Sequence, residues 1–283
     1  MRNKTETTLL KGNFYKELLE EYKQKIISYL GDPSVYRIAI FYFKTKNNNY
    51  FSINQQKIFE SIGLKVKSIF TEDQKEFTDL VRQYSSDEKT VGINVELPLP
   101  KNFDISCLYE IPVDKDLDCL NPVNYFNFVA SNDIQNIITP SVANAVILMM
   151  RHYNIEFEKK DIVVLGRSLY TGLAIAHILI KFNSTVQILN EYSKDLKHKC
   201  KSADIIISAT GKVNLINREF VNENSVVIDI GFEVVDGKIK GDVDIDSVKG
   251  IAKAVSIVPG GIGLLCNLST VINLYKLIKR YRI

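Results

Sequence analysis

Residues 161–182 read DIVVLGRSLYTGLAIAHILIKF, and this stretch decides the fold. The apolar run Ile162–Leu165 predicts a buried strand, and the periodic run Thr171–Phe182 predicts the helix that follows it. Gly166 and Gly172 flank the turn between them, where glycine lets the backbone approach an anion and the helix start offers free amides. The spacing is not GxGxxG, so a tight turn with close helix packing explains the two glycines equally well.

Two later strands also end in small residues, which is typical of a ligand crevice. Thr210 and Gly211 follow one apolar run, and Gly231 with Phe232 ends another. The carboxyl ends of parallel strands meet at one edge of a sheet, so we expect these residues beside the Gly166 turn. Glu191 lies where such units hold a ribose hydroxyl, although a solvated loop glutamate explains it nearly as well. The sequence therefore predicts a dinucleotide-binding unit.

The residues before this unit show the same alternation of strands and helices. Strand-like runs cover 36–43, 64–70 and 90–95, helical runs cover 14–30, 51–62 and 73–84, and residues 98–136 are typical of loops. The fold class is therefore α/β with two domains, of which the second is doubly wound. Because a last helix over 266–281 is expected to return to the first domain, we predict domains of 1–140 plus 265–283 and of 141–264.

Composition excludes several classes of protein. The 36 basic and 33 acidic side chains are spread along the chain, which argues against nucleic acid as a partner. No apolar run reaches the roughly 18 residues of a membrane helix, and the N-terminus lacks the apolar core of a secretion signal. The four cysteines and three histidines are scattered, so neither a metal site nor a disulfide framework is expected. These features favour a cytoplasmic enzyme or binding protein.

Seven short blocks, in a fixed order over nearly the whole chain, carry a family resemblance. They are VGINVELPLP (91–100), IPVDKDLDCLNPVN (111–124), ITPSVANAVILMM (138–150), VVLGRSLYTG (163–172), ADIIISATGK (203–212), VVIDIGF…DGKIKGDVD (226–244) and VPGGIG (258–263). Together they resemble the bifunctional methylenetetrahydrofolate dehydrogenase/methenyltetrahydrofolate cyclohydrolase family. The resemblance implies a Rossmann-type second domain, an active-site cleft between the domains, a tetrahydrofolate-type substrate, NADP or NAD as cofactor, and a homodimer.

The resemblance also assigns residues to the two ligands. The substrate residues it implies are Phe51, Leu97, Pro98, Asp118, Pro259, Gly260 and Gly261. The cofactor residues it implies are Gly166, Arg167, Ser168, Glu191, Thr210, Gly211 and Phe232. The implied chemistry is hydride transfer from a methylene carbon to give a methenyl cation, followed by attack of water to give a formyl product.

The chain departs from the family at the catalytic helix. The family carries a tyrosine and, four residues later, a lysine that assists proton transfer, and an ungapped alignment from Gly63 puts Phe51 and Gln55 there. The alternative register, Tyr50 with Asn54, restores the tyrosine but not the lysine. The family's glutamine before LPLP is Glu96 in this chain, so Gln55, Glu96 and Asp118 are the candidate catalytic residues.

Glu96 has two interpretations. A glutamate in a dry cleft has a raised pKa and serves as acid or base, which glutamine cannot do. Alternatively, Glu96 is a partly solvated carboxylate that holds the pterin ring or Gln55, an interpretation we favour somewhat. Asp118 matches the family's pterin-binding aspartate, but the neighbouring Cys119, like Cys266 further on, departs from the family, so a modified tetrahydropterin carrier fits as well.

The sequence leaves cofactor and activity open. Glu191 repels a 2′-phosphate and favours NAD, whereas Arg167 in the phosphate loop suits NADP. A working dehydrogenase is our preferred interpretation, because hydride transfer is a matter of positioning and needs no lysine. Cyclohydrolysis is then weak or dependent on Glu96. The alternatives are a non-catalytic pterin- or nucleotide-binding homologue and, against the blocks above, another Rossmann oxidoreductase.

Overall fold

The computed structural model describes residues 6–44 and 50–281, and the chain divides into two compact units. Unit 1 joins the N-terminal residues up to Phe14 with Val142–Cys266. Unit 2 joins Tyr15–Ser141 with the residues from Asn267 onward. Each unit is therefore assembled from segments that lie far apart in the sequence.

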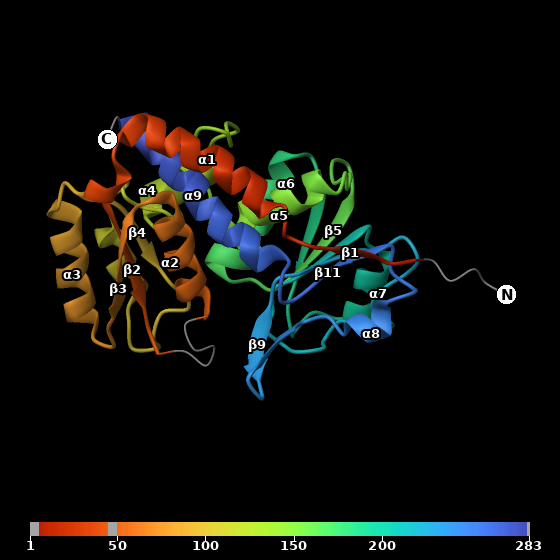
Figure 1. The fold of residues 1–283 in the computed structure, drawn as a ribbon. Coiled ribbons are helices and arrows are strands. Elements are labelled where there is room, and N and C mark those ends of the chain that lie inside the picture. Colours follow the sequence, from red (N-terminus) through yellow and green to blue (C-terminus); the bar gives the residue numbers. More distant parts are fainter. Residues whose placement is uncertain (1–5, 45–49, 282–283) are drawn as a thin grey trace. The chain divides into compact units, whose positions relative to one another are not determined.

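Unit 1 is built on a six-stranded parallel sheet of order β1-β11-β8-β7-β5-β6 (Figure 1). Its strands are β1 (Thr8–Leu10), β5 (Asp161–Leu165), β6 (Thr185–Leu189), β7 (Ile205–Ser208), β8 (Val226–Asp229) and β11 (Ala254–Ser256). Its helices are α5 (Ser141–His152), α6 (Ala174–Lys181), α7 (Leu196–Ser202) and α8 (Ile245–Val248), and β9 (Phe232–Val235) and β10 (Lys238–Gly241) form a hairpin. This is the predicted doubly wound α/β architecture.

The core of unit 1 explains why its strands read as continuous apolar runs. Strands β5, β7 and β8 are buried along most of their length, as strands covered on both faces must be. Their side chains pack with α7 and α8 in one cluster that includes Val163, Leu165, Cys200, Ile206, Val227 and Val248. The interiors of these strands are therefore apolar, and polar residues occur only at their ends.

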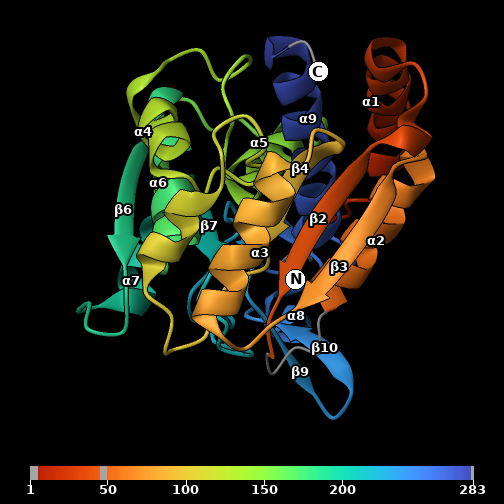
Figure 2. The same cartoon turned by 90° about the vertical axis from the view of Figure 1, so that its left-hand side faces the viewer.

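Unit 2 contains a three-stranded parallel sheet of order β3-β2-β4. The strands are β2 (Arg37–Tyr42), β3 (Lys65–Phe70) and β4 (Thr90–Val95). The helices are α1 (Tyr15–Leu30), α2 (Tyr50–Ile62), α3 (Gln74–Ser86), α4 (Pro122–Ala130) and α9 (Ile262–Tyr281), the last from Asn267 onward. Figures 1 and 2 show α3 on one face of this sheet and α2 on the other.

Aromatic rings fill the interface between the sheet and α3. Phe41 lies in β2 and Phe43 comes two residues later, just past its end. Their side chains therefore point to the same face of the sheet, the one that α3 covers. Phe77 of α3 lies with its ring centroid 5.2 Å from that of Phe41 and 5.8 Å from that of Phe43. All three are fully buried, so this face is closed core.

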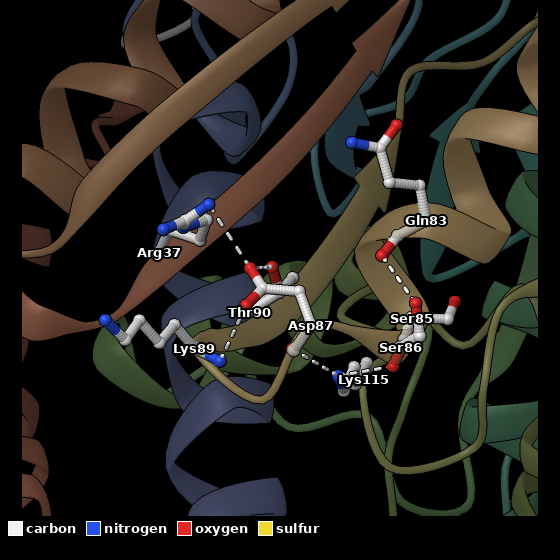
Figure 3. A network of polar contacts seen from close by, with 8 residues as sticks. All are labelled: Arg37, Gln83, Ser85, Ser86, Asp87, Lys89, Thr90 and Lys115. Atoms are coloured by element: carbon white, nitrogen blue, oxygen red, sulfur yellow. Dashed lines mark hydrogen bonds and ion pairs between the residues drawn. The ribbon is translucent and has the colours of Figure 1, made fainter.

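A polar network fixes the amino ends of β2 and β4 (Figure 3). Asp87 follows α3 and accepts a hydrogen bond from the Thr90 hydroxyl at 2.7 Å, while its carboxylate lies 3.3 Å from Arg37. The ammonium of Lys115 donates to the carbonyls of Ser85 and Asp87, at the carboxyl end of α3, where a cation is favoured. Burial lowers the pKa of Lys115.

Several elements differ from the sequence prediction, among them α4, α9 and β1. Residues 122–130 form α4 within the stretch expected as loop, and the Asn121 side chain accepts from the Val123 amide to cap it. Helix α9 begins at Ile262, four residues before the expected start at Cys266. Strand β1 was not predicted, and it pairs with β11 of unit 1, whereas the predicted domain boundaries put residues 1–140 in one domain. Those boundaries stay a prediction.

Among the described residues, we find no helix that combines the length and the apolar character needed to cross a membrane.

Candidate functional site

The Gly166 turn lies at the carboxyl end of β5 in unit 1. Gly166 has φ +118°, and a Cβ there would lie 2.5 Å from the carbonyl oxygen of Ala209, so only glycine fits. A Cβ on Gly172 would lie 2.1 Å from the carbonyl oxygen of Gly166. The packing interpretation of these glycines therefore describes real contacts. Arg167 and Ser168 in the turn are exposed.

The residues after β7 are held next to this turn by a carboxylate that sequence reasoning missed. Both the amide and the hydroxyl of Thr210 donate to Oδ2 of Asp242, each at 2.8 Å, and the Ser208 hydroxyl donates to the same oxygen at 2.7 Å. Its other oxygen, Oδ1, is buried without a partner. Asp242 belongs to the family block that ends in GDVD, but nothing in the sequence spacing links it to Thr210.

A second carboxylate, Asp229, holds Asp242 in turn. Asp229 accepts hydrogen bonds from the amides of Asp242 at 3.1 Å and Val243 at 3.0 Å. Burial, reinforced by the charge of Asp242, raises the pKa of Asp229 to about 7. Two carboxyl groups thus support the end of β7, and Thr210 and Gly211, which follow this strand, are exposed.

The loop after β6 presents Glu191 and Tyr192 to solvent. The Tyr192 amide donates to the Asn190 side chain at 2.9 Å, and the Asn190 amide donates to the Ser193 hydroxyl at 3.0 Å, which closes the loop. The Arg167 guanidinium lies over the Tyr192 ring, 5.9 Å from its centroid. The structure therefore brings the phosphate turn and the Glu191 loop together.

In unit 2, Gln55 is enclosed in an amide network rather than open to solvent. Asn94 of β4 donates through Nδ2 to the Gln55 side-chain oxygen at 2.8 Å, and Gln55 Nε2 donates to the Thr270 hydroxyl of α9 at 3.2 Å. Gln55 is 0% exposed. The side-chain oxygens of Asn94 and Asn267 are buried without partners. Sequence reasoning missed Asn94 and Thr270, because their strand and helix meet α2 only in the fold.

Glu96 lies beside this network and is less enclosed. It follows Asn94 by two residues along one strand, so both side chains point to the face that α2 covers. Ser52, one turn before Gln55 on α2, hydrogen-bonds to the Glu96 carboxyl, whose Oε2 is buried without a partner. Burial raises the pKa of Glu96. No hydrogen bond joins Glu96 to Gln55, so the two are neighbours in one polar layer rather than a bonded couple.

Asp118 lies in a loop that is registered against β4. Residues 115–117 run parallel to β4 through the bridge between Ile93 and Asp116, which places Asp118 beside the carboxyl end of the strand. The Asp116 carboxylate accepts from the amides of Leu120 and Asn121 and holds the loop. The Ser141 amide donates to Asp118 at 2.7 Å, and burial raises the pKa of Asp118 to about 7.

The remaining predicted residues fall in both units. Phe51 is half-buried on α2, Leu97 and Pro98 follow Glu96 in unit 2, and Pro259, Gly260 and Gly261 form a loop of unit 1. The alternative pair takes Tyr50, whose side chain lies outside the described residues. Within the described residues, no group of three or more histidine, cysteine or acidic side chains is placed to hold a metal ion.

This geometry defines a class of protein. A parallel sheet whose β5 ends in an open glycine turn, with small residues at the ends of its neighbours, is a dinucleotide-binding α/β fold. Residues 140–282 match the family model described as "Tetrahydrofolate dehydrogenase/cyclohydrolase, NAD(P)-binding domain". The chain belongs to the tetrahydrofolate dehydrogenase/cyclohydrolase family.

Relatives and solved structures agree over nearly the full length. The bifunctional protein FolD of Clostridium acetobutylicum is 34% identical over 272 residues, which cover 92% of this chain and 96% of the relative. The bifunctional FolD methylenetetrahydrofolate dehydrogenase/cyclohydrolase of Campylobacter jejuni superposes with a TM-score of 0.87 at 29% identity, covering 97% and 99% of the two chains. The Trypanosoma brucei enzyme, complexed with NADP and inhibitor, gives a TM-score of 0.88 at 26% identity, covering 98% of each chain.

Proposed function

We propose that this chain oxidises 5,10-methylenetetrahydrofolate to the methenyl form with NAD or NADP, and hydrolyses the methenyl form to 10-formyltetrahydrofolate. The observation that carries the proposal is the dinucleotide edge of unit 1, where a Cβ on Gly166 would meet the carbonyl oxygen of Ala209 and where Asp242 accepts hydrogen bonds from the amide and the hydroxyl of Thr210. The related enzymes from C. acetobutylicum and C. jejuni, described as bifunctional, support both steps.

The dinucleotide fits the residues present at that edge. The turn at Gly166 offers a backbone cradle that a Cβ would fill, and Arg167 supplies an exposed cation for a phosphate group. When bound, the dinucleotide accepts the hydride that leaves the methylene carbon. Thr210, Gly211 and Phe232 bind it at the ends of β7 and β8, while Asp242 fixes the Thr210 hydroxyl and amide.

On the substrate side, Asp118 binds the pterin through its N–H groups, because a carboxylate accepts two parallel hydrogen bonds. Its loop is fixed by Asp116 before any ligand arrives, so little ordering is needed on binding. Phe51, Leu97 and Pro98 lie in the same unit as Asp118 and are further substrate residues, and the Pro259–Gly261 loop of unit 1 is a substrate loop by the family resemblance.

Glu96 handles the proton of the hydrolytic step. Attack of water on the methenyl carbon forms a carbon–oxygen bond while the electrons of the carbon–nitrogen double bond return to nitrogen, and the carboxylate of Glu96, whose pKa is raised, accepts the proton that the water releases. Breaking the bond from that carbon to the ring nitrogen, with a proton delivered to the nitrogen, then gives the formyl product. Gln55 is enclosed, and both polar atoms of its side chain already have partners, so it acts through the amide network and not as an acid or base.

A spectroscopic assay tests the proposal. Methylenetetrahydrofolate is mixed with the protein and each dinucleotide, and absorbance follows both the reduced cofactor and the methenyl product. We expect reduced cofactor with wild-type protein, and decay of added methenyltetrahydrofolate faster than in buffer. Tight binding of both ligands without any reduced cofactor would instead identify a non-catalytic binding homologue.

For the cofactor we propose NAD over NADP, because Glu191 is exposed at the edge where the 2′-substituent of the ribose lies and repels a phosphate. Arg167 opposes this preference, since its guanidinium reaches the same loop at Tyr192. Comparing kcat/KM for the two dinucleotides decides between them. A lower value for NAD would refute the preference and make Arg167 the stronger determinant.

We further propose a homodimer in the cytoplasm. Strand β6 is the free edge of its sheet and leaves Ile188 39% exposed, which suits pairing with a second copy. All four cysteines are free thiols, which fits a reducing compartment. Light scattering at assay concentration should give the mass of two chains, and a monomer mass would contradict the dimer. Cell fractionation tests the compartment.

A further inference from the structure

The N-terminal segment of unit 1 runs along the strand that leads into the Pro259–Gly261 loop. Strand β1 pairs in parallel with β11, with Thr8 opposite Ala254 and Leu10 opposite Ser256 (Figure 1). The pairing continues past the strands, because the Ile257 amide donates to the Leu10 carbonyl at 3.2 Å. The N-terminal segment thus follows β11 up to the loop itself.

Gly12 is the point of closest approach. Its amide donates to the carbonyl of Gly260 at 2.8 Å, and a Cβ on Gly12 would lie 2.3 Å from the carbonyl oxygen of Gly261. That distance is far inside van der Waals contact and both partners are backbone, so any side chain at position 12 must push the loop away. Gly12 is itself buried, which leaves it little room to move in the other direction.

Tyr153, which directly follows α5, binds the backbone of the N-terminal segment at Lys11. Its hydroxyl accepts a hydrogen bond from the Lys11 amide at 2.8 Å and donates to the Lys11 carbonyl at 3.1 Å. The neighbouring His152 stacks on Phe14 with ring centroids 3.7 Å apart and planes 4° from parallel. Residues 11–14 are therefore fixed on both sides, and the Lys11 side chain takes no part because only its backbone is bound.

We infer that Gly12 and Tyr153 are positioning residues for the substrate loop Pro259–Gly261, a role that rests on the function proposed above. The N-terminal segment fixes the position of the loop at the end of β11 through the hydrogen bond from the Gly12 amide to the Gly260 carbonyl. Tyr153 sets the position of the segment.

Two variants test this role, Gly12→Ala and Tyr153→Phe, with Lys11→Ala as the matched control. Displacing the loop by about 1 Å should raise KM for methylenetetrahydrofolate about tenfold or more in Gly12→Ala, with KM for the dinucleotide unchanged. Tyr153→Phe should give a smaller increase in the same constant. Lys11→Ala keeps the bound backbone and should match wild type.

Hydrogen–deuterium exchange supplies a readout that needs no activity. The peptide covering residues 257–264 should exchange faster in both variants than in wild type or Lys11→Ala, while peptides from β5 and β7 keep wild-type rates. Wild-type KM and wild-type exchange in Gly12→Ala and Tyr153→Phe would overturn the inference. An inactive wild-type protein would overturn the proposed function, and the exchange data would still test how the loop is held.

Discussion

Glu96 and Gln55 are neighbouring residues with different access to a substrate. Gln55 is fully enclosed by hydrogen bonds to Asn94 and Thr270, whereas Glu96 is partly exposed and keeps one oxygen without a partner. Neutral amides do not exchange protons near pH 7, and a carboxyl of raised pKa does. Under the proposed function, the proton of the hydrolytic step is therefore handled by Glu96, which directly follows β4, and not by Gln55 of α2.

We predict that Glu96→Gln separates the two reactions. Hydrolysis of the methenyl form should fall by about 100-fold, the size typical of a lost general base, because the amide accepts no proton. Dehydrogenation, which transfers only a hydride, should change by about threefold or less. Glu60→Gln, on the exposed side of α2, is the control. Equal losses of both rates, measured by absorbance, would contradict a catalytic role for Glu96.

Asp118 predicts the pH dependence of substrate binding. Since burial raises the pKa of Asp118 to about 7, the carboxylate that accepts pterin N–H groups forms as pH rises through that value. KM for methylenetetrahydrofolate should therefore fall between about pH 6 and 8. Asp118→Asn should raise KM and abolish this slope. A wild-type KM that rises over the same range would refute the assignment.

The same shift makes a stability prediction with the opposite sense. The folded-state pKa lies above the usual 3.8, so the stabilisation from protonated Asp118 is complete at low pH and is lost as pH rises through about 7. Asp118→Asn keeps an acceptor for the Ser141 amide and does not titrate. Urea unfolding should show this variant gaining stability relative to wild type between about pH 4 and 7, the interval between the usual pKa and the folded-state pKa of Asp118. A constant difference would exclude the shift.

At the scale of elements, the hydrogen bonds and the ion pair of Asp87 fix the amino ends of β2 and β4, whereas Glu96 lies at the carboxyl end of β4. We predict that Asp87→Ala lowers the free energy of unfolding by about 1–2 kcal/mol, because the Thr90 hydroxyl and the Lys89 amide lose their acceptor. The Thr90 hydrogen bond lowers the pKa of Asp87, so this contribution is present above about pH 4 and disappears below it. Chemical denaturation of Asp87→Ala and of the exposed neighbour Glu88→Ala measures it, and equal stabilities would contradict it.

Elements with a single clear period could be predicted from the sequence, and those defined by distant partners could not. Strand 90–95 has the predicted bounds, because a short run of apolar residues marks it in the sequence. Strand β1 escapes prediction because three residues carry no period, and it exists only by pairing with β11. Likewise, Gln55 and Glu96 emerge from the resemblance, whereas Asn94, Thr270 and Asp242 acquire roles only through folded contacts.

At the scale of the whole molecule, side chains of α9 hydrogen-bond to loops of unit 2 that lie far away in the sequence. Asn273 is fully buried and donates to the carbonyls of Leu117 and Thr139, while its oxygen accepts from the Thr139 amide. Lys276, one turn later, donates to the carbonyls of Ile134 and Ile137. Helix α9 therefore binds both Leu117, which precedes Asp118, and residues 134–139, which precede Ser141.

We predict that Asn273→Ala destabilises the protein by about 3 kcal/mol, because three buried backbone groups lose their partners. Lys279→Ala, on the exposed side of α9, should be within about 0.5 kcal/mol of wild type. Thermal and urea unfolding compare the three proteins. An Asn273→Ala variant as stable as Lys279→Ala would show that α9 does not hold these loops.

The pairing of β1 with β11 has a consequence for synthesis of the protein. The Thr7 hydroxyl bonds to Ala252, a partner 245 residues later in the chain. The N-terminal segment therefore leaves the ribosome without its neighbour and stays unpaired until β11 has been made. Contacts of such long range form slowly, so among the described strands the last to be made completes the first, and the Pro259–Gly261 loop acquires its shape only after that pairing.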